Sequence, residues 1–399
     1  SGEIPARMQA RASADRAKLI TDGLKAADLA FDKVEALVTP RRLTLIIDGL
    51  PEKQPDLREE RRGPRADAPE KAINGFLAGN GVTLDQCEKR EMPKGTFLFA
   101  IVEQKGRAAS EVIKEIIEDA MAKLPWPKSM RWGTEKVRWV RQLDRILCLF
   151  DGTVIPVSYG PVTAGNTTSG HRFLAPAEFS VANGTEYKEK LRAAKVMIDR
   201  EERKQVILDG ARKLAAAEGF ELLEDNGLLE EVCGLVEWPV PVMGKVDDLF
   251  MDIPREVLET SMREHQKYFV VEDKSGKLAA RFITISNMET ADNNAKIIAG
   301  NERVLRARLH DAKFFWDQDR KVTLQSRLPK LDTIVFHAKL GSLAERLLRL
   351  RGLARSLSVA IPNYDVKLAD RSAELGQAAS VSVVVVEFAD LQGLARNSS

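Results

Sequence analysis

The stretch YFVVEDKSGKLAARFITIS, residues 268–286, contains two apolar runs separated by a polar tetrapeptide. Residues 268–271 and 280–286 are rich in β-branched and aromatic side chains, and Lys-Ser-Gly-Lys at 274–277 supplies the glycine that a tight turn favours. This pattern predicts a β-hairpin. After about residue 290 strand signals nearly vanish, and apolar residues recur every three or four positions in segments 301–316 and 342–357, which is the period of a helix. The chain is therefore predicted to be α+β first and all-helical afterwards.

Upstream of this hairpin the chain mixes helical and strand patterns. Helices are predicted at residues 6–27, 110–124, 185–195 and 201–217, and strands at residues 42–49, 95–104 and 235–244. Asp151-Gly152, between apolar runs at 143–150 and 154–158, predicts a second hairpin. The charged, proline-punctuated residues 51–69 are predicted to form a loop.

Composition indicates a globular chain with more than one domain. Of the 399 residues, 44% are hydrophobic and 30% are charged, and the net charge is +2. No run approaches 18 apolar residues, so neither a membrane span nor a signal peptide is expected. Cys87, Cys148 and Cys233 form no Cys-x-x-Cys pair, which argues against a zinc knuckle and favours a reducing, cytoplasmic location. Because the net charge is nearly zero, any RNA contact must come from local basic patches.

The usual sequence motifs of catalysis are absent. The chain has no Gly-x4-Gly-Lys-Ser/Thr loop, no Gly-x-Gly-x2-Gly turn, no Gly-x-Ser-x-Gly elbow and no His-Glu-x2-His helix. We therefore predict no catalytic residue on it.

A metal site is also not predicted. The chain has only four histidines, and a site built on imidazole needs several of them to converge. His265, His310-Asp311 and Asp332 could be combined into the H…HD…D ligand pattern of metal-dependent phosphohydrolases. The alternative, a solvated or capping role for His310, is the one we favour.

Several unusual strings follow one another in a fixed order. They are WPKSMRWG (126–133), RWVR (138–141), GHRF (170–173), LLEEV (228–232), GLVEWP (234–239), IPREV (253–257), HQKYF (265–269), SN (286–287), GNERVLRARL (300–309), DAKFF (311–315), KLG (339–341), EF (387–388) and LQG (391–393). Together, over about residues 3–393, they resemble the beta subunit of the bacterial heterotetrameric glycyl-tRNA synthetase.

This resemblance implies that adenylate formation and tRNA binding belong to two different subunits. In that family the alpha subunit carries the class II active site, where glycine and ATP, with Mg²⁺, form the adenylate. The beta subunit binds tRNA and is required for charging. The implied partners are thus the alpha subunit, in an α2β2 heterotetramer, and tRNA(Gly), with no cofactor on this chain and no membrane. In agreement, neither the HIGH and KMSKS motifs of class I synthetases nor the arginine-bearing motifs of class II are recognisable.

The resemblance also implies a domain order. Residues 1–322 are expected to be an α+β region similar to the B3/B4 region of the phenylalanine enzyme's beta chain, and residues 323–399 part of a helical HD-type domain. Two segments depart from the family pattern. A strand expected before Ile4-Pro5 is absent. In place of the family's helix, residues 381–386 are mostly valine, and such a β-branched run is predicted to be a poor helix former.

Seven arginines are the candidate tRNA contacts: Arg131, Arg138, Arg141, Arg172, Arg346, Arg349 and Arg351. The first three are interleaved with tryptophans and the last three with leucines. Guanidinium groups bind phosphates, and indole rings stack on unpaired bases.

A purely structural alternative stays open for each group of arginines. For the first group, Trp132 and Trp139 would be core anchors, and the nearby arginines would pair with acids such as Glu135 and Asp144. The turn at 170–173 would be a packed structural turn. The leucine-arginine segment would be a solvated helix with a leucine core. Three functions follow: a tRNA-binding, non-adenylating subunit of glycine–tRNA ligase, an HD-type metal-dependent phosphohydrolase, or a scaffold that only assembles the alpha subunit. We favour the first.

Overall fold

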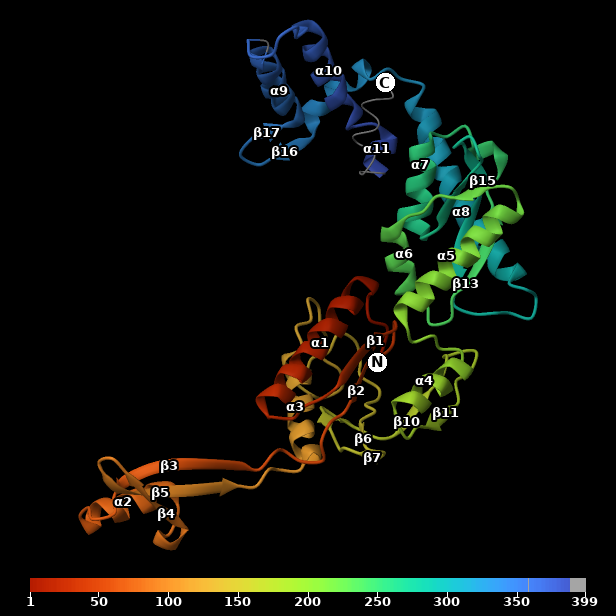
Figure 1. Ribbon diagram of the computed structural model, residues 1–399. Coiled ribbons are helices and arrows are strands. Elements are labelled where there is room, and N and C mark those ends of the chain that lie inside the picture. The colour runs from red at the N-terminus through yellow and green to blue at the C-terminus, as the bar shows by residue number, and fades with distance from the viewer. Residues whose placement is uncertain (358, 388–399) are drawn as a thin grey trace. The chain divides into compact units, whose positions relative to one another are not determined.

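The computed structural model describes residues 1–357 and 359–387, and the chain divides into two compact units (Figure 1). The first unit covers residues 1–203 and the second residues 204–399. Both combine helices with small antiparallel sheets, so the predicted α+β class is confirmed. Among the described helices, none has both the length and the apolar character that a bilayer span requires.

The core of the first unit lies between two helices and a hairpin. Its elements are α1 (Ala6–Ala26), β1 (Lys33–Val38), β2 (Leu43–Asp48) and α3 (Ala109–Lys123). α1 packs against α3 and against the antiparallel β1–β2 pair. Ile20 and Leu24 of α1 and Val112 of α3 belong to one buried cluster, because apolar side chains at helical spacing share a face. The predicted helices at 6–27 and 110–124 and the strand at 42–49 are confirmed to within one residue at each end.

An insert between β2 and α3 forms its own small sheet. It consists of β3 (Leu57–Arg65), α2 (Glu70–Asn80), a 3-10 turn, η1 (Leu84–Gln86), β4 (Cys87–Met92) and β5 (Gly95–Gln104), in the antiparallel order β3-β5-β4. The predicted loop at 51–69 is therefore wrong, since strand β3 occupies its central residues 57–65. The register shifts between Arg62 and Arg65, and Pro64 lies in this irregularity of an edge strand, where no ladder hydrogen bond is lost.

The rest of the first unit is built from very short strands and one helix. These are β6 (Leu149–Phe150), β7 (Thr153–Val154), β8 (Ser158–Tyr159), β9 (Val162–Thr163), β10 (Thr167–Ser169), β11 (Glu178–Ser180) and α4 (Gly184–Ala193). The hairpin predicted at Asp151-Gly152 is present, and both residues have positive φ, at 48° and 75°. Its strands are only two residues long, so the predicted apolar runs are mostly irregular chain.

The second unit begins inside α5 (Arg200–Ala217) and is built around a four-stranded antiparallel sheet. The strands follow one another across the sheet in the order β12 (Glu221–Leu222), β14 (Phe269–Glu272), β15 (Leu278–Ser286) and β13 (Val240–Lys245). The helices that pack with it are α6 (Asn226–Cys233), α7 (Arg255–Thr260) and α8 (Ala295–Asp319). Successive strand residues point to opposite faces. Phe269 and Val271 pack with α5 and α6, whereas Val270 packs with α7 and α8.

The hairpin predicted at 268–286 is confirmed as β14–β15. Its turn is fixed by Asp273, whose carboxylate accepts N–H groups of Ser275 at 2.8 Å and Lys277 at 3.0 Å. Gly276 has a φ of 78°, which glycine tolerates without strain. The strand predicted at 235–244 is shorter, because β13 starts only at Val240.

The C-terminal part of the second unit is mainly helical. It contains the 3-10 segment η4 (Gln325–Thr333), β16 (Val335–His337), β17 (Gly341–Ser342), α9 (Leu343–Leu357), α10 (Val366–Ala379) and α11 (Val383–Glu387). Two short helical turns lie earlier in the second unit, η2 (Asp248–Phe250) and the π-helical η3 (Ser261–His265). The β16–β17 hairpin shows that this part is not all-helical. The principal division at 203/204 falls inside the predicted first region, and the boundary at 322/323 stays a prediction.

Residues 383–387 correct a further prediction, because this valine-rich segment is helical. The Asp319 carboxylate accepts the N–H groups of Val383 and Val384, both at 2.9 Å, and Val384 is part of a buried core cluster. These tertiary contacts outweigh the low intrinsic helix propensity of valine. Part of the predicted EF string and the LQG string lie outside the described residues.

Candidate nucleic-acid interface

An aromatic cluster surrounds the tryptophans that sequence reasoning selected. The Trp139 ring meets Trp126 at 5.1 Å and Tyr159 at 5.6 Å between centroids, both edge to face. Trp139 is 4% exposed and packs with Ile4 and Leu143. It is therefore a core anchor and cannot stack on a base. The structural alternative is thus confirmed for Trp139, whereas Trp132 is only partly buried against the same cluster.

The three arginines beside this cluster differ in the number of hydrogen bonds that their guanidinium groups make. Arg138 donates from Nε to the Ser129 hydroxyl at 3.0 Å and from Nη2 to the Ser129 carbonyl at 3.2 Å. Arg141 donates to the carbonyl of Val140 at 2.8 Å. Arg131 is exposed and makes no hydrogen bond or ion pair within the part of the chain that the structure describes. Arg131 is thus the most available cation of this group.

The acids expected to neutralise these arginines do not do so. Within residues 1–357 and 359–387, neither Glu135 nor Asp144 pairs with Arg131, Arg138 or Arg141. Asp144 instead lies 3.9 Å from the terminal ammonium. That part of the structural alternative is wrong, and the cluster keeps an uncompensated positive charge.

The turn at residues 170–173 both packs and presents a cation. Its anchor is His171, which is fully buried and accepts N–H groups of Phe173 at 3.3 Å and Leu174 at 3.2 Å on Nδ1. These two bonds fix the orientation of the His171 ring. Arg172 pairs with Glu3 at 2.9 Å and lies 4.9 Å above the ring of Phe173, which is 62% exposed. The turn therefore displays a guanidinium on an aromatic ring.

Arg141 and Arg172 flank the same short segment of the chain. A side chain at Gly2 would lie 3.1 Å from the Cβ of Arg141, and Gly2 donates its N–H to the carbonyl of Gln142 at 2.8 Å. Glu3, the next residue, holds Arg172. No local sequence motif predicts this arrangement, because the segments that contain Gly2, Arg141 and Arg172 are far apart in the sequence.

The basic helix predicted near the end of the chain is α9, and its arginines have unequal roles. Arg346 lies 4.5 Å above the ring of Phe336, and Arg349 donates to the carbonyl of Leu340 at 3.0 Å. Arg351 forms two hydrogen bonds with the Asp370 carboxylate, at 2.9 and 2.6 Å, and so joins α9 to α10. The Arg351 bond, with a second from Arg355, holds the pKa of Asp370 well below its ordinary value. Arg351 is therefore a structural residue.

The leucines of α9 do not form the single core that the solvated-helix alternative requires. Leu347 is 8% exposed, whereas Leu348 and Leu353 are 67% and 62% exposed. Of the seven candidate arginines, four belong to the first unit and three to the second.

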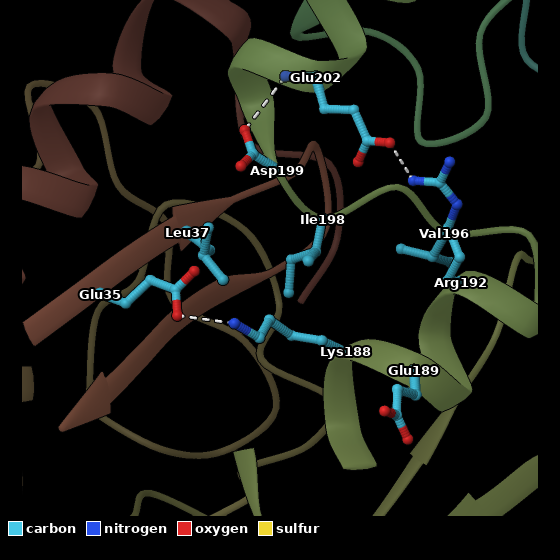
Figure 2. Close-up of a pocket in the computed structure, with 9 residues that line it drawn as sticks. All are labelled: Glu35, Leu37, Lys188, Glu189, Arg192, Val196, Ile198, Asp199 and Glu202. Atoms are coloured by element: carbon cyan, nitrogen blue, oxygen red, sulfur yellow. Dashed lines mark hydrogen bonds and ion pairs between the residues drawn. The ribbon is translucent and has the colours of Figure 1, made fainter. Parts of the chain in front are cut away.

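A pocket of about 440 Å³ in the first unit is not suited to a polyanion (Figure 2). It lies between β1, α4 and the start of α5, and its lining residues are Glu35, Leu37, Lys188, Glu189, Arg192, Val196, Ile198, Asp199 and Glu202. Lys188 pairs with Glu35 at 2.8 Å, and Arg192 pairs with Glu202. Four carboxylates thus face two cations, and the balance disfavours phosphate. Sequence reasoning missed this pocket because its walls come from segments about 150 residues apart.

The metal-ligand pattern considered from sequence is not assembled. Across the described residues, no group of three or more His, Cys, Asp and Glu side chains lies close enough to hold a metal ion. His265, His310-Asp311 and Asp332 therefore do not converge there.

Comparison with known proteins confirms the resemblance drawn from the motif series. The profile of the family described as "Glycyl-tRNA synthetase beta subunit" matches residues 1–397, and the chain belongs to this family. Its relatives carry the name glycine–tRNA ligase beta subunit. The chain is 50% identical to that of Ruegeria sp. (strain TM1040) over 404 residues, which are 99% of this chain and 58% of the relative. It is 49% identical to that of Rhodospirillum centenum over 420 residues, 98% of this chain and 59% of the relative. The chain thus spans a little more than half the length of these relatives.

Proposed function

We propose that this chain is the tRNA-handling part of a two-subunit glycine–tRNA ligase in the cytoplasm. A separate alpha subunit, in an α2β2 assembly, forms glycyl adenylate from glycine and ATP with Mg²⁺, and this chain binds tRNA(Gly) without contributing a reacting side chain. The observation that carries the proposal is the identity of about 50% with glycine–tRNA ligase beta subunits over 99% of the chain.

The geometry supports RNA contact by a subset of the predicted arginines. Among the residues that the structure describes, Arg131 has no acidic partner, and Arg172 lies over an exposed aromatic ring. Such groups neutralise phosphates and stack on unpaired bases. Arg349 of α9 is exposed and donates to the carbonyl of Leu340, so its charge is also available. Arg138, Arg141 and Arg346 are partly engaged, and Arg351 is the weakest candidate because two carboxylates hold it.

The finer domain assignments belong to the same proposal. We take residues 1–322 as similar to the B3/B4 region and residues 323–399 as the beginning of a helical HD-type domain. The motif series that resembles the family supports both assignments. The packing of α9 on α10 is compatible with the second.

Two measurements test the function. The first is filter binding of a tRNA(Gly) transcript to this chain at 50 and 200 mM salt. We expect binding that weakens steeply with salt, because phosphate contacts release counterions. The second is glycine attachment by purified alpha subunit with and without full-length beta subunit, which we expect to depend on both. A beta subunit that supports charging but binds no RNA is a scaffold only, and that result would overturn the proposal.

A further inference from the structure

The insert of residues 57–104 has a sheet with two chemically different faces. On one face lies α2, and the β5 residues Leu98 and Ala100 beneath it are 1% and 0% exposed. The ring of Phe76 approaches so closely that a side chain at Gly63 would lie 2.5 Å from it. This face is therefore the core of the insert.

The opposite face carries aromatic rings covered by guanidinium groups. Side chains alternate along a strand, so Phe97, Phe99 and Ile101 point away from α2. Residues paired across strands share a face, and Phe99 pairs with Arg62, while Phe97 pairs with Arg90. The guanidinium of Arg62 lies 4.0 Å above the Phe97 ring, and that of Arg90 lies 5.0 Å above the Phe99 ring.

The same pairing rule gives this face an excess of positive charge. The pairing places Arg58, Arg62, Arg65 and Arg90 on the open face together with Glu60 and Glu88, and Glu103 is the cross-strand partner of Arg58, so four arginines stand against three glutamates. Arg90 holds both glutamates, at 2.7 and 2.5 Å. Arg65 pairs with Asp67 at 2.8 Å. Arg62 has no carboxylate partner in the described part of the chain, and the Phe97 ring is its one recorded contact.

We propose that this face is a stacking platform for unpaired bases of the RNA that the protein binds. The inference rests on the proposed function and assigns it a surface. Each phenylalanine supports a guanidinium from below, so that the other side of the planar group can serve as a stacking surface. The N–H groups of Arg90 are held by Glu60 and Glu88, whereas those of Arg62 can bind phosphates. The Arg62–Phe97 pair is the principal element, because Arg62 is not neutralised.

The spacing of the two rings selects single-stranded nucleotides. Phe97 and Phe99 are two positions apart on one strand, which places them about 6.8 Å apart. Successive bases in a stacked helix are only about 3.4 Å apart. Two neighbouring bases can therefore occupy both positions only when they are unstacked from each other, as in a loop or a free end.

Three variants of the full chain test this inference against a matched control. The variants are Phe97→Leu with Phe99→Leu, which keeps apolar strand residues, and Arg62→Gln and Arg90→Gln. The control is Lys89→Gln, which removes one positive charge from β4 on the side that pairs with Leu98 under α2. The probes are a tRNA(Gly) transcript, a short single-stranded RNA and an RNA duplex, with affinity measured by fluorescence anisotropy at several salt concentrations.

The phenylalanine pair is expected to weaken single-stranded RNA and tRNA binding by about 10-fold or more, since it removes the rings that support both stacking positions. Arg62→Gln should weaken binding and flatten its salt dependence, whereas Lys89→Gln and duplex binding should change less than twofold. If the unchanged chain binds tRNA, and both Arg62→Gln and the phenylalanine pair bind it with the same affinity, this inference is overturned and the proposed function is not. Loss of alpha-subunit capture with unchanged RNA affinity would overturn it in favour of a protein interface. A wild-type chain that binds no RNA would overturn the proposed function as well.

Discussion

Asp319 and Arg327 form an ion pair of 2.7 Å in the second unit, with side chains only 11% and 4% exposed. The same Asp319 carboxylate accepts the N–H groups of Val383 and Val384, at 2.9 Å each. One carboxylate at the end of α8 therefore fixes η4 and the start of α11 together. This explains why a valine-rich segment adopts a helical turn at that point.

Replacing Asp319 by alanine should destabilise residues 325–387. It leaves Arg327 buried without a counter-charge, and breaking one side of a buried ion pair costs about 3–5 kcal/mol. Hydrogen exchange of the backbone amides in η4 and α11 measures the loss. Asp317→Ala is the control, since Asp317 is 42% exposed and pairs with Lys313 at 3.5 Å; exposed pairs contribute at most about 1 kcal/mol. Equal protection in both variants would contradict the central role of Asp319.

The α9–α10 contact should weaken in acid through Asp370. Arg351, and then Arg355, hold the pKa of this carboxyl below its ordinary value of about 3.9. A depressed folded-state pKa stabilises the fold above the unfolded pKa and ceases to do so as pH falls through the folded one. The difference in thermal midpoint between wild type and Asp370→Asn should therefore be largest above about pH 5 and shrink steadily below pH 4. A difference that does not vary with pH would rule out this ion pair as the cause.

The parts of the fold that sequence predicted correctly have local causes. The β14–β15 hairpin follows from Asp273 and Gly276, which make its turn, and from apolar runs on both sides. Helices α1 and α3 follow from apolar spacing alone. Strand β3 was missed because its arginines and glutamates do not alternate with apolar residues. Their strand conformation depends on pairing with β5, which lies about 40 residues further along the chain.

The roles of the candidate arginines could not be predicted because their partners are distant in sequence. Arg172 is held by Glu3, 169 residues away, and Arg351 by Asp370 in another helix. Trp132 and Trp139 both follow an arginine in the sequence. Trp139 is nevertheless buried against Trp126 and Tyr159, whereas Trp132 is only partly buried. Spacing selects residue types that suit RNA, but tertiary contacts decide which of them remain available.

The turn that presents Arg172 should not tolerate a side chain at Gly170. A Cβ at Gly170 would lie 2.5 Å from both the carbonyl oxygen of Ala175 and the Cβ of Ala194. Gly170→Ala is therefore expected to lower the free energy of unfolding by about 1–3 kcal/mol, as other overpacked substitutions do. Gly165→Ala is the matched control, because nothing lies within 4 Å of its added Cβ. Urea unfolding of both variants measures the difference, and equal midpoints would show that the turn can relax.

Arg131 and Arg138 should separate RNA binding from folding. Arg131 has no partner within the described residues, so Arg131→Gln is expected to leave the free energy of unfolding within about 0.5 kcal/mol of wild type. If its guanidinium contacts one phosphate, the slope of log affinity against log salt should become shallower by about 0.9. Arg138→Gln loses two hydrogen bonds to Ser129 and should cost about 1 kcal/mol of stability.

Filter binding of tRNA(Gly) at four salt concentrations, with urea unfolding of the same preparations, distinguishes these two effects. A stability loss in Arg131→Gln with no change in salt slope would place Arg131 among the structural residues of the aromatic cluster. An unchanged slope and unchanged stability would remove it from the interface altogether. Because Trp139 is a core residue, Trp139→Ala should instead cost about 3–5 kcal/mol and lower RNA binding only in proportion to the unfolded fraction. These outcomes together would assign the RNA contact on this side of the first unit to guanidinium groups and not to the buried ring of Trp139.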